Sequence, residues 1–229
     1  MIPLLAAVLA IDSLTLDVQT REVIEQHWTD ADRAIPVGSL VKPFLAMAYP
    51  GDFPEFTCTG DRCWLASGHG RLKFQKALAD SCNAYFLNLA HNVDAATLAV
   101  VATKFGIPAP DQDSPEARIG LGASWRIAPI ALARAYAELV ARSGEPRVRE
   151  ILDGLRMSAE SGTAAAIGRG FLAKTGTAPC VSKPKDAGDG FVVILEPAEA
   201  PRRVLLMRVH GVPGARAAKI AARTLRSGK

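Results

Sequence analysis

Ser39 and Lys42 are spaced for nucleophilic chemistry. Residues three apart on a helix lie on the same face, with about 5–6 Å between their Cβ atoms, so the lysine amine can reach the serine hydroxyl. A serine is a weak nucleophile and needs a base beside it. Lysine serves as that base only when neutral, and because its ordinary pKa is about 10.4, burial or a nearby cation must lower it. Alone, this pair is more often an ordinary helix start.

A second motif, Ser81-Cys82-Asn83, stands where an apolar helix begins. A serine there can relay a proton, and the asparagine offers both a donor and an acceptor. Ser and Asn are also favoured at helix N-termini whatever the function, so a helix cap is the alternative interpretation, and on the motif alone the favoured one.

A third motif, Lys174-Thr175-Gly176-Thr177, follows a strand-like run. The lysine supplies a cation, the threonines supply hydroxyls, and the glycine lets a substrate backbone approach closely. Such a strand edge suits an extended peptide bound by main-chain pairing. A phosphate-binding loop is excluded, because no glycine-rich segment leads into this lysine.

Hydrophobic periodicity and turn signals place these motifs on elements. Strands are predicted at both ends of the chain and helices in the middle, so we expect an α+β protein whose termini share one sheet. The predicted strands are 13–19, 22–28, 170–178, 191–195 and 204–209, the predicted helices are 39–49, 72–92, 95–105, 129–142 and 215–226, and 50–70 and 179–189 are loops.

Composition narrows the class of protein. The 229 residues are 49% hydrophobic and 22% charged, which excludes a disordered or collagen-like chain. The net charge of +4 is too small to indicate nucleic-acid binding. On the last helix a basic stripe forms either a solvated face or a contact for an anionic surface; its members are Arg216, Lys219, Arg223 and Arg226.

Two further features bear on the cellular compartment in which the protein works. Residues 1–12 form an apolar segment, too short to span a bilayer, which is either a signal remnant or the start of a buried element; residues 13–229 form one domain. Cys58 and Cys63 flank a polar turn that can bring their thiols together, so a disulfide and free thiols are both open. We expect no metal, because the spacing is not Cys-x-x-Cys and no second ligand pair follows at zinc-finger distance.

Taken together and in this order, the three motifs resemble those of the transpeptidase domain of penicillin-binding proteins, most nearly the class B type. The resemblance runs from about residue 13 to the C-terminal helix. It includes the active-site helix (36–44), the second-motif region (69–86), the triplet Gly162-Thr163-Ala164, the opening hairpin (16–23) and the strand after the third motif (190–193).

The resemblance implies a five-stranded antiparallel sheet with flanking helices beside a mostly helical lobe. It implies a D,D-transpeptidase or D,D-carboxypeptidase that acts on D-Ala-D-Ala stem peptides of peptidoglycan and binds β-lactam antibiotics, outside the cytoplasm, without a cofactor or an integral membrane span. Other cell-wall synthesis proteins are candidate partners. We expect the membrane anchor and N-terminal pedestal usual in the family to be missing.

The resemblance also implies a role for each motif residue. Ser39 is the nucleophile, Lys42 its base, and Ser81 relays the proton to the leaving amine with help from Lys174. Asn83 holds the peptide. The terminal carboxylate binds at Thr175 and Thr177, with Gly176 between them, and the backbone N–H groups of Ser39 and Thr177 form the oxyanion hole.

Two alternatives to this function stay open. One is a serine β-lactamase, although no acidic loop resembles the deacylating glutamate of the class A enzymes, which argues against fast hydrolysis. The other is a non-catalytic β-lactam or muropeptide sensor, or a cell-wall scaffold. The intact motifs count against that second alternative.

Overall fold

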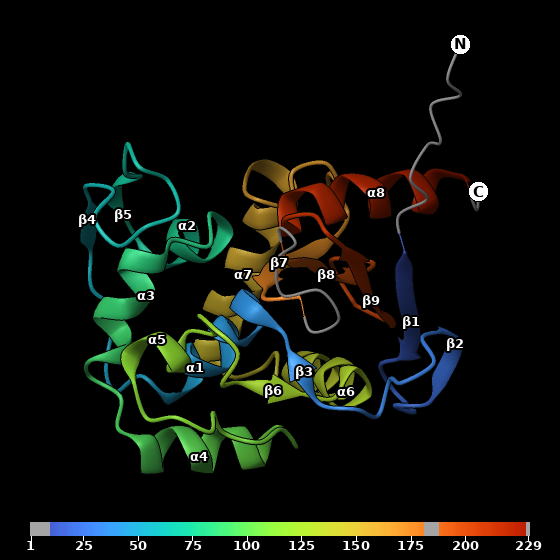
Figure 1. Cartoon of the computed structure of the whole chain (residues 1–229), viewed down its shortest axis with the longest axis horizontal. Helices are drawn as coiled ribbons and strands as arrows, with labels where there is room; N and C mark the ends of the chain where they lie inside the picture. Colours follow the sequence, from blue (N-terminus) through green and yellow to red (C-terminus); the bar gives the residue numbers. More distant parts are fainter. Residues whose placement is uncertain (1–9, 181–187, 228–229) are drawn as a thin grey trace.

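Strands from both ends of the chain form one antiparallel sheet in the computed structural model, which describes residues 10–180 and 188–227. Its order is β2-β1-β9-β8-β7 (Figure 1). The strands are β1 (Ile11–Asp17), β2 (Val23–His27), β7 (Leu172–Ala178), β8 (Asp189–Glu196) and β9 (Arg203–His210). The five-stranded α+β architecture expected from the sequence is confirmed.

Strand β8 is buried on both faces, which explains its unbroken apolar sequence. Val192 and Ile194 pack toward α8 (Gly214–Ser227) through its alanines. The alternating neighbours Phe191 and Val193 join the larger core on the opposite face. Because successive strand residues point to opposite faces, one short run serves both layers.

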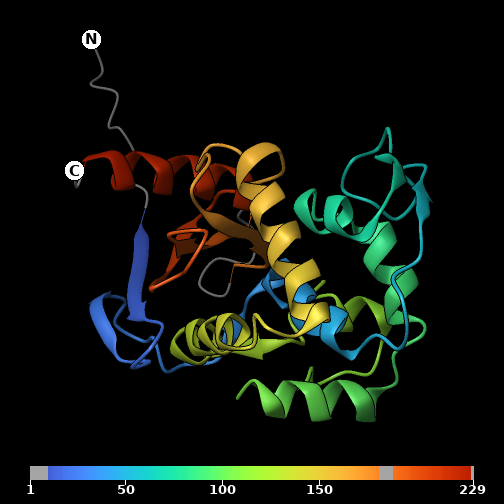
Figure 2. The same ribbon diagram turned by 180° about the vertical axis from the view of Figure 1, so that it is seen from behind.

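Helices cover both faces of the sheet. Helix α8 lies on one face and α6 (Pro129–Ala141) on the other (Figures 1 and 2). Arg216, Lys219, Arg223 and Arg226 are exposed on the outer side of α8. No helix in the described part of the chain is long and apolar enough to cross a membrane.

A mostly helical lobe stands beside the sheet. Its central helix α1 (Lys42–Ala48) is almost wholly buried. The other elements are α2 (Phe74–Ala79), α3 (Asn83–Ala90), α4 (Ala95–Lys104), α5 (Pro115–Arg118) and two small sheets, β3 (Ile35–Pro36) with β6 (Arg126–Ile127) and β4 (Phe56–Cys58) with β5 (Gly70–Leu72).

The structure differs from the sequence expectations in several places; one is β4, which lies inside the predicted loop 50–70. The helix predicted at 39–49 begins as a 3₁₀ turn, η1 (Gly38–Val41), and continues as α1. The single helix predicted at 72–92 is two helices, α2 and α3, which are separated at the second motif. Helix α7 (Pro146–Ser161), which packs on β7, was not predicted at all.

Residues 1–9 of the N-terminal segment, and residues 181–187 of the predicted loop, lie outside the described residues. Strand β1 begins at Ile11, two residues before the predicted domain boundary.

The first turn of the central helix lies against the edge strand. Gly38 has a φ of +60°, and a Cβ atom there would lie 2.3 Å from the carbonyl oxygen of Thr177. On the helix side, Tyr136 donates a hydrogen bond of 2.8 Å to the Leu40 carbonyl. The backbones of η1 and β7 therefore meet without a side chain between them.

We expect Gly38→Ala to destabilise the fold more than Gly51→Ala. Both glycines have positive φ, so both variants lose about 1–2 kcal/mol to left-handed backbone strain. Only Gly38 faces a backbone clash, since a Cβ at Gly51 meets nothing within 4 Å. The clash should add about 1–3 kcal/mol, measured by urea denaturation. Equal losses in the two variants would show that η1 moves away from β7 freely.

Candidate active site

The 3₁₀ turn aligns Ser39 with Lys42. Side chains three residues apart eclipse in this helix type, so the two project from the same side. Ser39 is half-buried and lines a cleft, whereas Lys42 is 0% exposed. Among the described residues, the hydrogen bonds of Lys42 go to the second motif and not to Ser39.

Two oxygen atoms of the second motif anchor the Lys42 amine. Its Nζ lies 2.8 Å from the Ser81 carbonyl oxygen and 2.7 Å from Oδ1 of Asn83, with Oγ of Ser81 at 3.3 Å. A neutral amine has two N–H groups and one lone pair. The carbonyl and amide oxygens can only accept, so they take both N–H groups and leave the lone pair for a hydroxyl.

Ser81 is held between two lysines. Lys174 Nζ donates to Ser81 Oγ at 2.8 Å and to the Thr175 carbonyl at 2.9 Å. Ser81 has a φ of +53°, an uncommon value for a residue with a side chain. The helix break at residues 80–82 thus turns the Ser81 hydroxyl toward both amines.

Burial is the main reason that both lysines depart from their ordinary titration. It lowers the pKa of Lys42 from 10.5 to about 7, against a smaller opposing effect of Cys82 and Cys63. Burial first, and then the charge of Lys42, lower the pKa of Lys174 well below its usual value. Of the two causes expected from the sequence, burial and a nearby cation, burial is the dominant one for both groups.

The helix-cap alternative for the second motif is wrong. The residue that precedes the first turn of α3 is Cys82, and no side chain caps that helix. Asn83 is the first residue of the helix, and its side chain faces Lys42 rather than the backbone of the helix. The motif is therefore built around the lysine amine.

The third motif lies on the edge strand β7 with its glycine against η1. A Cβ on Gly176 would lie 2.6 Å from the carbonyl oxygen of Val37. Thr175 is buried and donates to the Thr163 hydroxyl at 2.6 Å, while the exposed Thr177 accepts a hydrogen bond from the Gly214 N–H at 2.9 Å. This contact leaves the Thr177 hydroxyl proton free to donate to a ligand.

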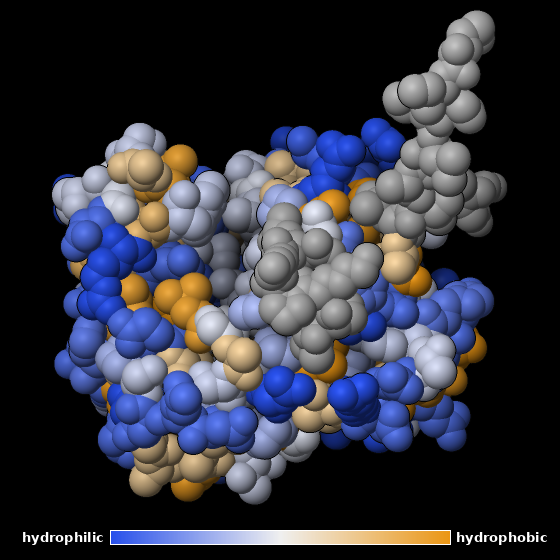
Figure 3. All heavy atoms as spheres, viewed as in Figure 1, coloured by the Kyte–Doolittle hydropathy of each residue, from blue (hydrophilic) through white to orange (hydrophobic). Residues whose placement is uncertain are grey.

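These motifs border one cleft of about 580 Å³ between the lobe and the sheet. The molecular surface is hollowed between the lobe that carries β4 and β5 and the sheet (Figure 3). The lining of the cleft includes Ser39, Ser81, Asn83, Thr175, Gly176 and Thr177. Four further parts of the lining were not expected from the sequence, namely Trp64, Leu121, Thr163 and residues 213–215. Of these, only Thr163 carried a signal, in the triplet that precedes β7.

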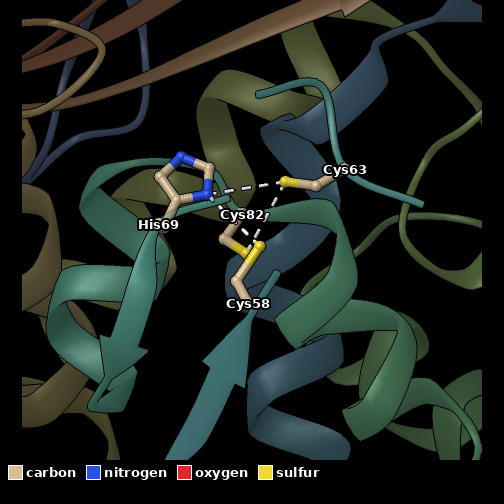
Figure 4. Close-up of side chains that lie close together, drawn as sticks. All are labelled: Cys58, Cys63, His69 and Cys82. Atoms are coloured by element: carbon tan, nitrogen blue, oxygen red, sulfur yellow. Dashed lines mark hydrogen bonds between the residues drawn. The ribbon is translucent and has the colours of Figure 1, made fainter. Parts of the chain in front are cut away.

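The thiols beside the cleft are not paired as a disulfide. Cys58 and Cys63 are free, as is Cys82. All three sulfur atoms instead lie beside Nδ1 of His69 (Figure 4). The expectation of no metal rested on the spacing of Cys58 and Cys63 and left Cys82 and His69 out.

The family model of the penicillin binding protein transpeptidase domain matches residues 61–227. The chain belongs to this family. The match includes the second and third motifs, and the first motif lies N-terminal to it. No curated protein sequence matches the chain.

Solved structures confirm the fold of this penicillin-binding transpeptidase domain. Pseudomonas aeruginosa PBP2 in complex with WCK 5153 is 18% identical at a TM-score of 0.78, over 95% of this chain and 73% of that one. Helicobacter pylori PBP2 in complex with MreC is 15% identical at a TM-score of 0.81, over 96% of this chain and 60% of that one. The D,D-transpeptidase domain of a peptidoglycan glycosyltransferase from Eggerthella lenta is 16% identical at a TM-score of 0.78, over 97% of this chain and 78% of that one.

We expect the ε-amine of Lys42 to titrate near pH 7, because burial penalises its charged form. NMR of protein labelled with ¹³C at the lysine ε-carbon measures this, and Lys42→Arg identifies the resonance by its loss. If the chemical shift of the Lys42 resonance shows no titration below pH 10, burial does not lower the pKa of this amine.

Proposed function

We propose that this protein is a D,D-transpeptidase or D,D-carboxypeptidase that acts on D-Ala-D-Ala stem peptides of peptidoglycan through an acyl-Ser39 intermediate. The observation that carries the proposal is the meeting of three motifs at one cleft, with a buried lysine of lowered pKa behind the serine. Membership of the family supports the general class of reaction.

In the proposed acylation step, Ser39 Oγ attacks the carbonyl carbon of the penultimate D-alanine. Neutral Lys42 accepts the hydroxyl proton through its lone pair. As the C–N bond breaks, Ser81 passes a proton to the leaving amine of the terminal D-alanine. Ser81 Oγ hydrogen-bonds to both lysines, and this supports its role as the bridge for that proton.

The remaining motif residues bind and orient the substrate in this proposal. Asn83 holds the stem peptide, and the Thr177 hydroxyl binds the terminal carboxylate in the field of Lys174. Thr175, whose hydroxyl donates to Thr163, would have to rotate that hydroxyl to join it. The backbone N–H groups of Ser39 and Thr177 stabilise the oxyanion. The contact of Gly38 with the Thr177 backbone supports this pairing, because it brings the two segments side by side.

An amine or a water molecule then releases the acyl group, and this choice decides between cross-linking and carboxypeptidase activity. We further propose that the protein works outside the cytoplasm and binds β-lactams, which acylate the same serine. Partners among cell-wall synthesis proteins are proposed by analogy with the Helicobacter pylori PBP2 that was solved with MreC.

Benzylpenicillin tests the nucleophile directly. We expect a stable one-to-one adduct by intact-protein mass spectrometry, mapped to Ser39 and absent in Ser39→Ala. Ser143→Ala, an exposed serine outside the cleft, should label normally. Antibiotic that is consumed without an adduct would favour a β-lactamase, and neither adduct nor consumption would favour a scaffold.

The acylation rate should rise with pH through about 7, because only neutral Lys42 accepts the proton. At pH 6 we expect about one-tenth of the plateau rate. Lys42→Ala should lower the rate by about 10²–10⁴-fold while the circular dichroism spectrum stays unchanged. Normal acylation by this variant would remove Lys42 from the role of base.

A further inference from the structure

Three cysteines and one histidine converge beside the second motif. Their ligand atoms, Sγ of Cys58, Cys63 and Cys82 and Nδ1 of His69, all lie within 4.8 Å of one another. Figure 4 shows the three sulfur atoms and the imidazole turned toward a common centre. Cys58 and Cys82 are buried, and the other two are half-buried.

The spacing of these atoms fits a tetrahedral zinc site. With Zn–S bonds of about 2.3 Å and a Zn–N bond of about 2.0 Å, the edges of a tetrahedron are about 3.8 Å between two sulfurs and about 3.5 Å between sulfur and nitrogen. Sγ of Cys63 lies 3.8 Å from Sγ of Cys82. Nδ1 of His69 lies 3.6 Å from Sγ of Cys58 and 3.5 Å from Sγ of Cys63.

The chemistry of the donor atoms also suits zinc. Three thiols and one imidazole form one of the common ligand sets of structural zinc, and thiolates select zinc over hard cations.

The segment that supplies three of these ligands has no core of its own. None of residues 59–71 is buried, and of residues 50–71 only Cys58 is. The segment nevertheless folds tightly, since a Cβ on Gly68 would lie 2.3 Å from the carbonyl oxygen of Cys58. A metal ion is the usual substitute where a small segment cannot bury enough apolar surface.

We propose that Cys58, Cys63, His69 and Cys82 bind one structural zinc ion that fixes the 58–72 segment to the second motif. Three thiols lose their protons on binding, so the site with Zn²⁺ carries a net charge of −1. All four positions are filled by protein ligands, so zinc here has no open position for a substrate.

The fourth ligand connects this site to the cleft. Cys82 lies between Ser81 and Asn83, both of which hydrogen-bond to Lys42. Zinc bound to Cys82 would help to hold Ser81 at its positive φ. The same segment presents Trp64, which lines the cleft and donates a hydrogen bond to the carbonyl of Asp80.

Metal content tests the site without reference to activity. The full chain, purified without chelators, should hold about one zinc per molecule by elemental mass spectrometry. Cys58→Ser and Cys63→Ser should lose it. Co²⁺ in place of zinc should give intense thiolate-to-cobalt charge-transfer absorption, which these variants lack.

Cys180→Ser is the matched control and should keep the metal. Cys180 lies in a different group, with Asp189 and His210, where the two imidazole nitrogens already contact Asp189 and Asp12. The proposal is overturned by zinc that survives in Cys63→Ser, by the absence of both zinc and cobalt binding, or by a mass lower by two hydrogens that maps to a disulfide among the three cysteines.

A second measurement tests the effect on the cleft and rests on the proposed function. Removal of zinc, or Cys63→Ser, should slow acylation of Ser39 by benzylpenicillin by about 10- to 100-fold, because Ser81 loses its support. Zinc binding without any effect on acylation would overturn this positioning role. Acylation by a wild-type chain that binds no zinc would overturn the metal site and leave the proposed function standing.

Discussion

Lys42 and Lys174 are buried against the same hydroxyl, that of Ser81. Removing an ammonium group from water costs several kcal/mol, so neither amine would stay there unless the surrounding fold held it. Lys42 begins the helix at the centre of the lobe, and Lys174 lies on the edge strand of the sheet. The cleft is therefore located where the two parts of the fold bring these lysines together.

That arrangement places strict demands on the backbone. The first turn of the central helix has to reach the edge strand, which requires Gly38 and Gly176 at the contact. The long helical segment of the lobe has to stop at Ser81, at a backbone angle that few residues with side chains adopt. Such departures from ordinary local structure are typical of functional sites, because only tertiary contacts can maintain them.

Sequence reasoning found the elements with strong apolar patterns and missed those that tertiary contacts define. Strand β8 and helix α6 can be predicted from their own sequences, because both are rich in apolar residues at the spacing of their element. Helix α7 went unpredicted because its composition is polar, although Val148, Ile151 and Leu155 line one buried face. Ser81 and Asn83 suit a helix start, but the apolar pattern of 72–92 continues on both sides of them, so the sequence predicted one unbroken helix. The motifs predicted both lysines as site residues, but only their burial shows why their pKa values fall.

The second motif illustrates how one short turn can carry two kinds of chemistry. Ser81 and Asn83 line the cleft, whereas the side chain between them faces the cluster with His69. A turn with a positive φ has little intrinsic preference for its shape, so contacts on both sides have to specify it. The lysine amine supplies oxygen-directed hydrogen bonds on one side. The sulfur and imidazole ligands supply the contacts on the other side. This explains why Cys82 stands between Ser81 and Asn83, whose side chains face the cleft.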